Sequence, residues 1–149
     1  MAQILYTMQF KGKAAPANDA GTVLKATTTA PSCTITTVVG AAGVSGSVQP
    51  TDGAQARFES QVTLTGETSF QEEGAITFGD NQHRLYFSTV GQGYLGPSAD
   101  PQLQHGSVIW RVERGEGQFA GATGLITSNF FVNSAGEVTD NHFGVIFVK

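Results

Sequence analysis

Apolar and polar residues alternate along most of the chain, and a period of two is typical of half-buried β-strands. The first segment, from Ile4 to Phe10, places its even-numbered residues on one face and Leu5, Thr7 and Gln9 on the other. Similar alternation, with runs of β-branched residues, predicts further strands at 22–29, Cys33–Val39, Arg57–Thr65, Ser69–Phe78, His83–Val90, Ser107–Glu113, Gln118–Val132 and Val138–Val148. No stretch of ten residues carries a helical stripe.

Turn residues separate these segments. Asn18 to Gly21, Gly79 to Gln82 and Ser134 to Gly136 are typical of tight turns between neighbouring strands. The Gly-, Ala- and Ser-rich stretch from Gly40 to Gly53 indicates a long hairpin or loop, because too few residues precede it to form a separate domain. We therefore predict one domain over residues 1–149.

About eight strands without crossover helices predict either a β-sandwich or a closed barrel. Glycines inside the predicted strands, such as Gly74, Gly121, Gly124 and Gly144, favour the barrel, because strong coiling needs positions without a side chain. The prediction is an all-β fold: a single antiparallel barrel of about eight strands with little or no helix.

Composition narrows the functional classes. Charged residues make up 13% of the chain, the net charge is −4 and no basic stripe is present, which argues against nucleic-acid binding. The single Cys33 cannot form an intramolecular disulfide. The alternating N-terminal segment is too short for a signal core or a membrane span, so we expect a cytoplasmic protein without a membrane partner.

A glycine-rich segment runs from Trp110 to Phe130. Gly115-x-Gly117-x-x-Ala120 imitates a dinucleotide-binding fingerprint, but that fingerprint must open a helix, and a strand pattern follows here. The segment instead resembles the corner of allene oxide cyclase-like barrels, which it matches at Gly115, Gly117, Phe119, Gly121, Ala122 and Gly124. In a barrel of this kind, Phe119 is expected to turn inward and plug one end.

The resemblance also implies a class of chemistry, the rearrangement of an apolar metabolite without a cofactor. Its plant members use a carboxylate and an amide on the first strand and a buried cysteine. Here Thr7 stands at the carboxylate position and Gln9 at the amide position, while Cys33 is a candidate for the cysteine. The missing carboxylate argues against the plant reaction itself.

The histidines do not indicate a metal site. A metal-binding barrel of the cupin type needs a His-x-His pair on one strand face, and His83, His105 and His142 form no such pair. The groups Asp80 to His83 and Asp140 to His142 hold possible ligands, but Asp-Asn pairs at strand ends are more typical of turns. We predict neither a metal nor a cofactor.

Three residues are the candidate acid–base and anion-binding groups. His105 follows a long loop and opens a strand, which suits a proton-transferring group at a barrel mouth. Arg111 lies in the same strand and reaches an interior anion if Val108 and Trp110 face outward, although the opposite phasing is equally open. Glu73 is the candidate carboxylate, because the neighbouring Gly74 leaves room for a ligand.

Aromatic and amide side chains could line an apolar pocket, and the candidates are Tyr6, Gln9, Tyr86, Tyr94, Trp110 and Phe130. We expect a small apolar or aromatic metabolite as partner, and a cofactor-free cyclase, isomerase or lyase. A non-catalytic carrier and a structural or assembly subunit are the alternatives. Strands with apolar groups on both faces, such as Thr34–Val39 and Leu64–Phe78, predict a homo-oligomer, a trimer or a dimer.

Overall fold

The computed structural model describes all 149 residues and contains nine strands and one short 3-10 turn. The strands are β1 (Ala2–Pro16), β2 (Val23–Gly40), β3 (Gly43–Leu64), β4 (Ser69–Phe78), β5 (His83–Thr89), β6 (Gly93–Pro97), β7 (Leu103–Glu116), β8 (Thr123–Asn133) and β9 (Glu137–Val148), and the turn is η1 (Gly117–Phe119). No helix is long and apolar enough to cross a membrane.

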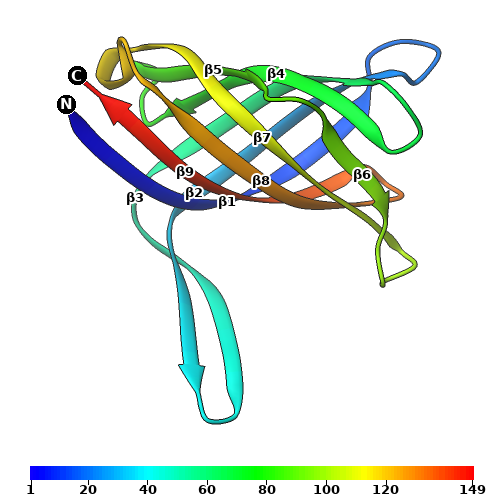
Figure 1. Cartoon of the computed structure of the whole chain (residues 1–149), viewed down its shortest axis with the longest axis horizontal. Coiled ribbons are helices and arrows are strands. Elements are labelled where there is room, and N and C mark those ends of the chain that lie inside the picture. Colours follow the sequence, from blue (N-terminus) through cyan, green and yellow to red (C-terminus); the bar gives the residue numbers. More distant parts are fainter.

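Eight of the strands form a closed antiparallel ring. The order is β3-β2-β1-β9-β8-β7-β5-β4, and pairing between β3 and β4 closes it, while the short β6 pairs with β4 and β7 (Figure 1). The first and last strands are neighbours, with Ala2 opposite Val148 and Lys13 opposite Glu137. The predicted all-β, barrel-like fold of about eight strands is confirmed.

The inner surface is formed by the apolar residues of the alternating pattern. In β1, Phe10 is fully buried, whereas Leu5 on the opposite face is 63% exposed. Aromatic rings fill the middle of the ring, with Phe58 stacked on Phe87 at 5.4 Å and Phe87 packed against Trp110 at 4.4 Å. This aromatic centre separates the interior into two ends.

Two strand glycines permit close approaches inside the ring. A Cβ atom at Gly74 would collide with the backbone carbonyl of Glu59 on β3, and a Cβ atom at Gly144 would collide with the ring of Tyr6. These contacts support the expectation that the interior glycines are needed for tight coiling.

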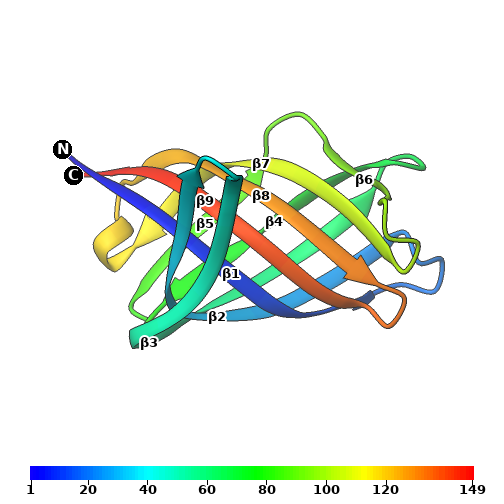
Figure 2. The same ribbon diagram turned by 90° about the horizontal axis from the view of Figure 1, so that it is seen from below.

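Strands β2 and β3 continue beyond the ring as a two-stranded extension, hereafter the arm, in which residues 33–40 pair with residues 43–50 (Figures 1 and 2). The strands leave the ring at an irregularity between Pro31 and Cys33. No charged residue occurs from 26 to 51, and Val39 and Val44 are 81% and 72% exposed. The long hairpin expected around Gly40–Gly53 is therefore present, but its strands are continuous with those of the ring.

Two local predictions differ from the structure. The strand predicted from Gln118 starts only at Thr123, because η1 turns the chain between β7 and β8. The pattern also missed β6, which has only five residues. Within η1, Phe119 is buried and packs against Phe78 at 5.2 Å, so it plugs one end of the ring as expected.

Candidate functional site

Buried polar side chains on the inner surface gather toward the end of the ring that carries the β1–β2 and β8–β9 turns. They come from five strands and are Thr28, Ser60, Glu72, Ser128, Asp140 and His142. Burying polar and ionisable groups costs free energy unless they are paired. A cluster of such groups in one part of the interior is therefore a candidate functional site.

Glu72 projects inward from β4 and is 8% exposed. Val62 of β3 lies opposite Glu72 and Ser60 lies opposite Gly74, which places Ser60 diagonally across from the carboxyl group. The Ser60 hydroxyl donates a hydrogen bond of 2.5 Å to Glu72 Oε2. A Cβ atom at Gly74 would collide with Cα and Cβ of Ser60, so the glycine allows β3 and β4 to approach closely at this point.

The same diagonal arrangement recurs on β8 and β9. Asp140 lies opposite Phe130, and Ser128 lies opposite His142. The Ser128 hydroxyl donates to Asp140 Oδ1 at 2.6 Å, and Asp140 Oδ2 lies 2.8 Å from Nε2 of His142. Asp140 is thus held by two partners, whereas Glu72 has one.

The two carboxyl groups act on each other across the interior. Strands β4 and β9 are separated by the same number of strands in either direction round the ring, so Glu72 and Asp140 project from opposite walls. Burial raises the pKa of Glu72 to about 8, and the negative charge of Asp140 adds to the rise, while the Ser60 hydrogen bond opposes it. Near neutral pH, Glu72 therefore carries a proton and can donate it.

Several buried polar atoms near the carboxyl groups have no hydrogen-bond partner. These atoms are Thr28 Oγ1, His142 Nδ1 and Trp110 Nε1, of which Trp110 Nε1 lies near enough to the Glu72 carboxyl group to oppose the rise of its pKa but does not reach hydrogen-bond geometry. The His142 ring stacks on Phe10 at 4.4 Å, which fixes its orientation. Unsatisfied buried groups are rare in folded proteins, and a catalytic or ion-binding role is among the explanations for them.

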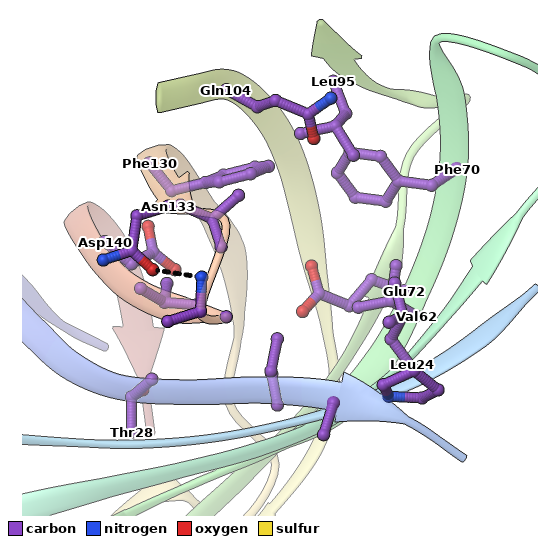
Figure 3. Close-up of a pocket in the computed structure, with 18 of the residues that line it drawn as sticks. Leu24, Thr28, Val62, Phe70, Glu72, Leu95, Gln104, Phe130, Asn133 and Asp140 are labelled. Atoms are coloured by element: carbon purple, nitrogen blue, oxygen red, sulfur yellow. Dashed lines mark hydrogen bonds between the residues drawn. The ribbon is translucent and has the colours of Figure 1, made fainter. Parts of the chain in front are cut away.

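A pocket of about 410 Å³ lies at this end of the ring, and the two carboxyl groups form part of its wall. Its walls are mainly apolar and include Leu24, Val62, Phe70, Leu95 and Phe130, while Glu72, Asp140 and Thr28 provide polar groups. Figure 3 shows Glu72 and Asp140 reaching into it from different strands, with Gln104 and Asn133 also lining it. An apolar pocket with a few convergent polar groups is the usual form of a small-molecule site.

A second pocket, of about 430 Å³, lies at the plugged end of the ring beside Tyr6, Phe78 and Phe119. The Tyr6 hydroxyl is buried without a partner. Burial raises the pKa of Tyr6 above its ordinary range, and the charge of Asp140 adds to the rise. This pocket has no carboxyl group among its lining residues.

The predicted acid–base and anion-binding residues do not meet in the interior. Glu73 and Arg111 are exposed, because their neighbours Glu72 and Trp110 occupy the inward positions of the alternation. Of the two phasings left open for Arg111, the structure has the one that faces outward, and Glu73 lies on the outer face, where it lines a shallow surface pocket with Gly74 and Tyr86. His105 lies near the start of β7, as expected for a residue that follows the long loop, and its ring centroid is 6.3 Å from that of Tyr94. It is exposed and does not line the carboxyl pocket.

The predicted ligand-contacting residues divide between the two faces. Phe130 lines the carboxyl pocket, Trp110 is buried in the aromatic centre, and Tyr6 lines the second pocket. Three predicted residues face outward instead. These are Gln9, which bonds to Asn141, Tyr86, whose ring lies beneath Arg114, and Tyr94, which is 46% exposed.

Sequence reasoning missed the residues that the structure brings together. Asp140 and His142 were interpreted as part of a turn, which is wrong, because they lie within β9 and face inward. The sequence did contain an indication of their position. Asp140 and His142 are even-numbered, like the apolar Ile146 and Val148, and residues two apart in a strand lie on the same face. No group of three or more His, Cys, Asp or Glu residues is arranged to hold a metal ion.

The positions matched to the plant cyclases lie outside the interior. Thr7 and Gln9 take the outward positions of β1, opposite in phase to Phe10. Cys33 lies at the base of the arm, where its thiol contacts the Thr7 carbonyl at 3.6 Å. Comparison of the chain with family models, with curated proteins and with solved structures finds no match.

Proposed function

We propose that this protein binds a small, largely apolar molecule inside the ring and catalyses proton transfer on it without a cofactor, as an isomerase, cyclase or lyase. The observation that carries the proposal is the pair of buried carboxyl groups, Glu72 and Asp140, in one apolar pocket. The resemblance to allene oxide cyclase-like barrels points to the same class of chemistry, although it does so through a turn and not through the site.

The two carboxyl groups suit different roles. Glu72 retains a proton near neutral pH and can donate it to an acceptor atom of a ligand. Asp140 is oriented by Ser128 and His142 and can accept a proton from an adjacent carbon. Together, one proton given and one taken would isomerise a ligand without any net change in its atoms.

A neutral fluorescent probe tests binding. N-phenylnaphthylamine should bind at one site per chain, and filling the pocket with Val62→Trp should weaken its binding at least tenfold. The matched control is Gln61→Trp, because Gln61 is the exposed neighbour of Val62 and its side chain faces outward. Leu95→Trp provides a second filled-pocket variant if Val62→Trp does not fold.

A nitrobenzisoxazole tests proton transfer. A carboxylate base removes its ring C–H proton, that bond's electron pair forms a nitrile, and the N–O bond breaks to give a coloured cyanonitrophenolate. Because Asp140 is the proposed base, we expect a saturable rate that is lost in Asp140→Asn and retained in Glu73→Gln. The rate should fall as the pH rises through about 8, where Glu72 loses the proton that it gives to the leaving phenolate oxygen. Binding of N-phenylnaphthylamine with only background elimination would instead favour the carrier, and absence of binding would overturn the whole proposal.

A further inference from the structure

The carboxyl pocket has an unbalanced charge. Its lining residues include the acidic Glu72 and Asp140, but no lysine, arginine or histidine. His142 contacts Asp140 from behind and is not among the lining residues. A ligand that enters this pocket therefore meets two carboxyl groups and no basic side chain.

Aromatic rings surround the same space. Phe58, Phe70 and Phe130 all line the pocket, and Phe70 and Phe130 meet edge to face with their centroids 5.9 Å apart. The faces of aromatic rings attract cations, and the attraction strengthens when water is excluded. Aromatic rings combined with carboxyl groups form a common environment for protonated amines.

Thr28 supplies an independent polar contact. Its side chain is 2% exposed, lines the pocket and has a hydroxyl oxygen without a partner. That oxygen can accept a hydrogen bond, as can Asp140, whereas an ammonium group offers up to three donors. With Glu72 in its ionised form, the pocket offers three acceptor groups, Thr28, Asp140 and Glu72, for the three donors of such a head group.

We infer that the ligand of this pocket is a small apolar amine, whose cationic head lies between Glu72, Asp140 and Thr28 and whose apolar part packs against Leu24, Val62 and Leu95. The inference rests on the pocket used in the proposed function and adds the charge of its ligand. An anionic head would face Asp140 without a counter-charge. A neutral head group could form hydrogen bonds here, but it would gain no electrostatic attraction to the carboxylates.

Amine binding should be coupled to the proton of Glu72. Asp140, and behind it His142, are the titratable groups that face Glu72 across the interior, while Glu59 and Arg84 on the neighbouring strands point outward. A bound cation favours the ionised form of Glu72, so binding near neutral pH must release the proton. Affinity for an amine should therefore rise with pH and level off at about pH 8.

The experiment uses three molecules with the same chain and different heads. Octylamine, octanol and octanoate are each used to displace N-phenylnaphthylamine from the intact 149-residue chain. We expect octylamine to bind at least tenfold more tightly than octanol and octanoate to bind most weakly. Octylamine affinity should rise up to tenfold per pH unit below about pH 8 in the wild type and in Glu73→Gln, and this slope should vanish in Glu72→Gln.

The outcomes separate this inference from the proposed function. If N-phenylnaphthylamine binds but octylamine is no better than octanol, the amine inference is overturned and the pocket assignment stands. If octanoate binds best, the charge argument is reversed. If the fluorescent probe itself does not bind, the pocket assignment fails. Asp140→Asn, which removes the second charge, should reduce the preference for octylamine even if Glu72→Gln alters the fold.

Discussion

The substitution Glu72→Gln keeps the shape of the buried side chain and an acceptor for the Ser60 hydroxyl, but it removes the ability to ionise. In the folded protein the pKa of Glu72 is about 8, compared with an ordinary value of 4.5. Between these two values the folded chain holds a proton that the unfolded chain releases. The contribution of Glu72 to stability is thus fully present below about pH 4.5 and is lost as the pH rises through about 8.

The size of the effect follows from the pKa difference. At about 1.4 kcal/mol per pKa unit, the rise from 4.5 to about 8 corresponds to at most about 5 kcal/mol. The wild type and Glu72→Gln should have similar unfolding free energies near pH 4.5. Above pH 8 the variant should be more stable by up to that amount. Few single substitutions in a folded protein stabilise it so strongly.

Urea unfolding followed by circular dichroism measures this difference, with unfolding free energies determined from about pH 5 to about pH 9. Comparing the variant with the wild type at each pH cancels the contributions of the other titrating groups. Glu73→Gln is the matched control and should show no such trend, because Glu73 is exposed. Trp110, the only tryptophan in the chain, lies in the aromatic centre and provides a second signal, a fluorescence change centred near pH 8. A stability difference between Glu72→Gln and the wild type that stays constant over this range would refute the reasoning.

Three further predictions concern charge, packing and assembly. Asp140→Asn removes the charge that helps to raise the pKa of Glu72, so the midpoint of the Trp110 fluorescence titration should move to lower pH, and an unchanged midpoint would contradict this. Gly74→Ala should lower the unfolding free energy by about 1–3 kcal/mol, because the new methyl group collides with the β3 backbone. Gly40→Ala, where the methyl group has open space, should be nearly neutral, and equal effects of the two substitutions in urea unfolding would contradict the prediction. We also propose that the chain self-associates through the exposed valines of the arm, so Val39→Glu should reduce the mass measured by light scattering. A wild-type chain that is already monomeric at micromolar concentration would reject this proposal.

The alternation of apolar and polar residues predicts which face of a strand is buried. Applied to the charged residues as well, it would have led to a better choice of site residues. In Ser69–Phe78, Glu72 shares its parity with Phe70 and Ile76, while Glu73 belongs to the other face. The empty space beside Gly74 favoured Glu73 in the sequence, but that space is occupied by contacts with β3. Parity alone would have identified Glu72 as the inward carboxyl group.

The meeting of Glu72 and Asp140 could not be predicted in the same way. It depends on the order of strands round the ring and on the register of two separate hairpins, neither of which is encoded in a local pattern. The arm has a similar origin. Continuous β-branched residues predict strands on both sides of Pro31, but only the pairing shows that the strands leave the ring there.

Pairing of β1 with β9 has a consequence for how the protein folds. Most neighbouring strands are joined by short connections and can pair as they are synthesised, whereas residues paired between β1 and β9 are separated by well over one hundred positions. Such distant contacts slow folding and, until they form, leave the edges of β1 and β8 open to other chains. Strand β9 both completes the ring between β8 and β1 and brings Asp140 to face Glu72. A chain in which β9 has not yet paired therefore lacks the carboxyl pair, so the proposed chemistry requires the completed ring.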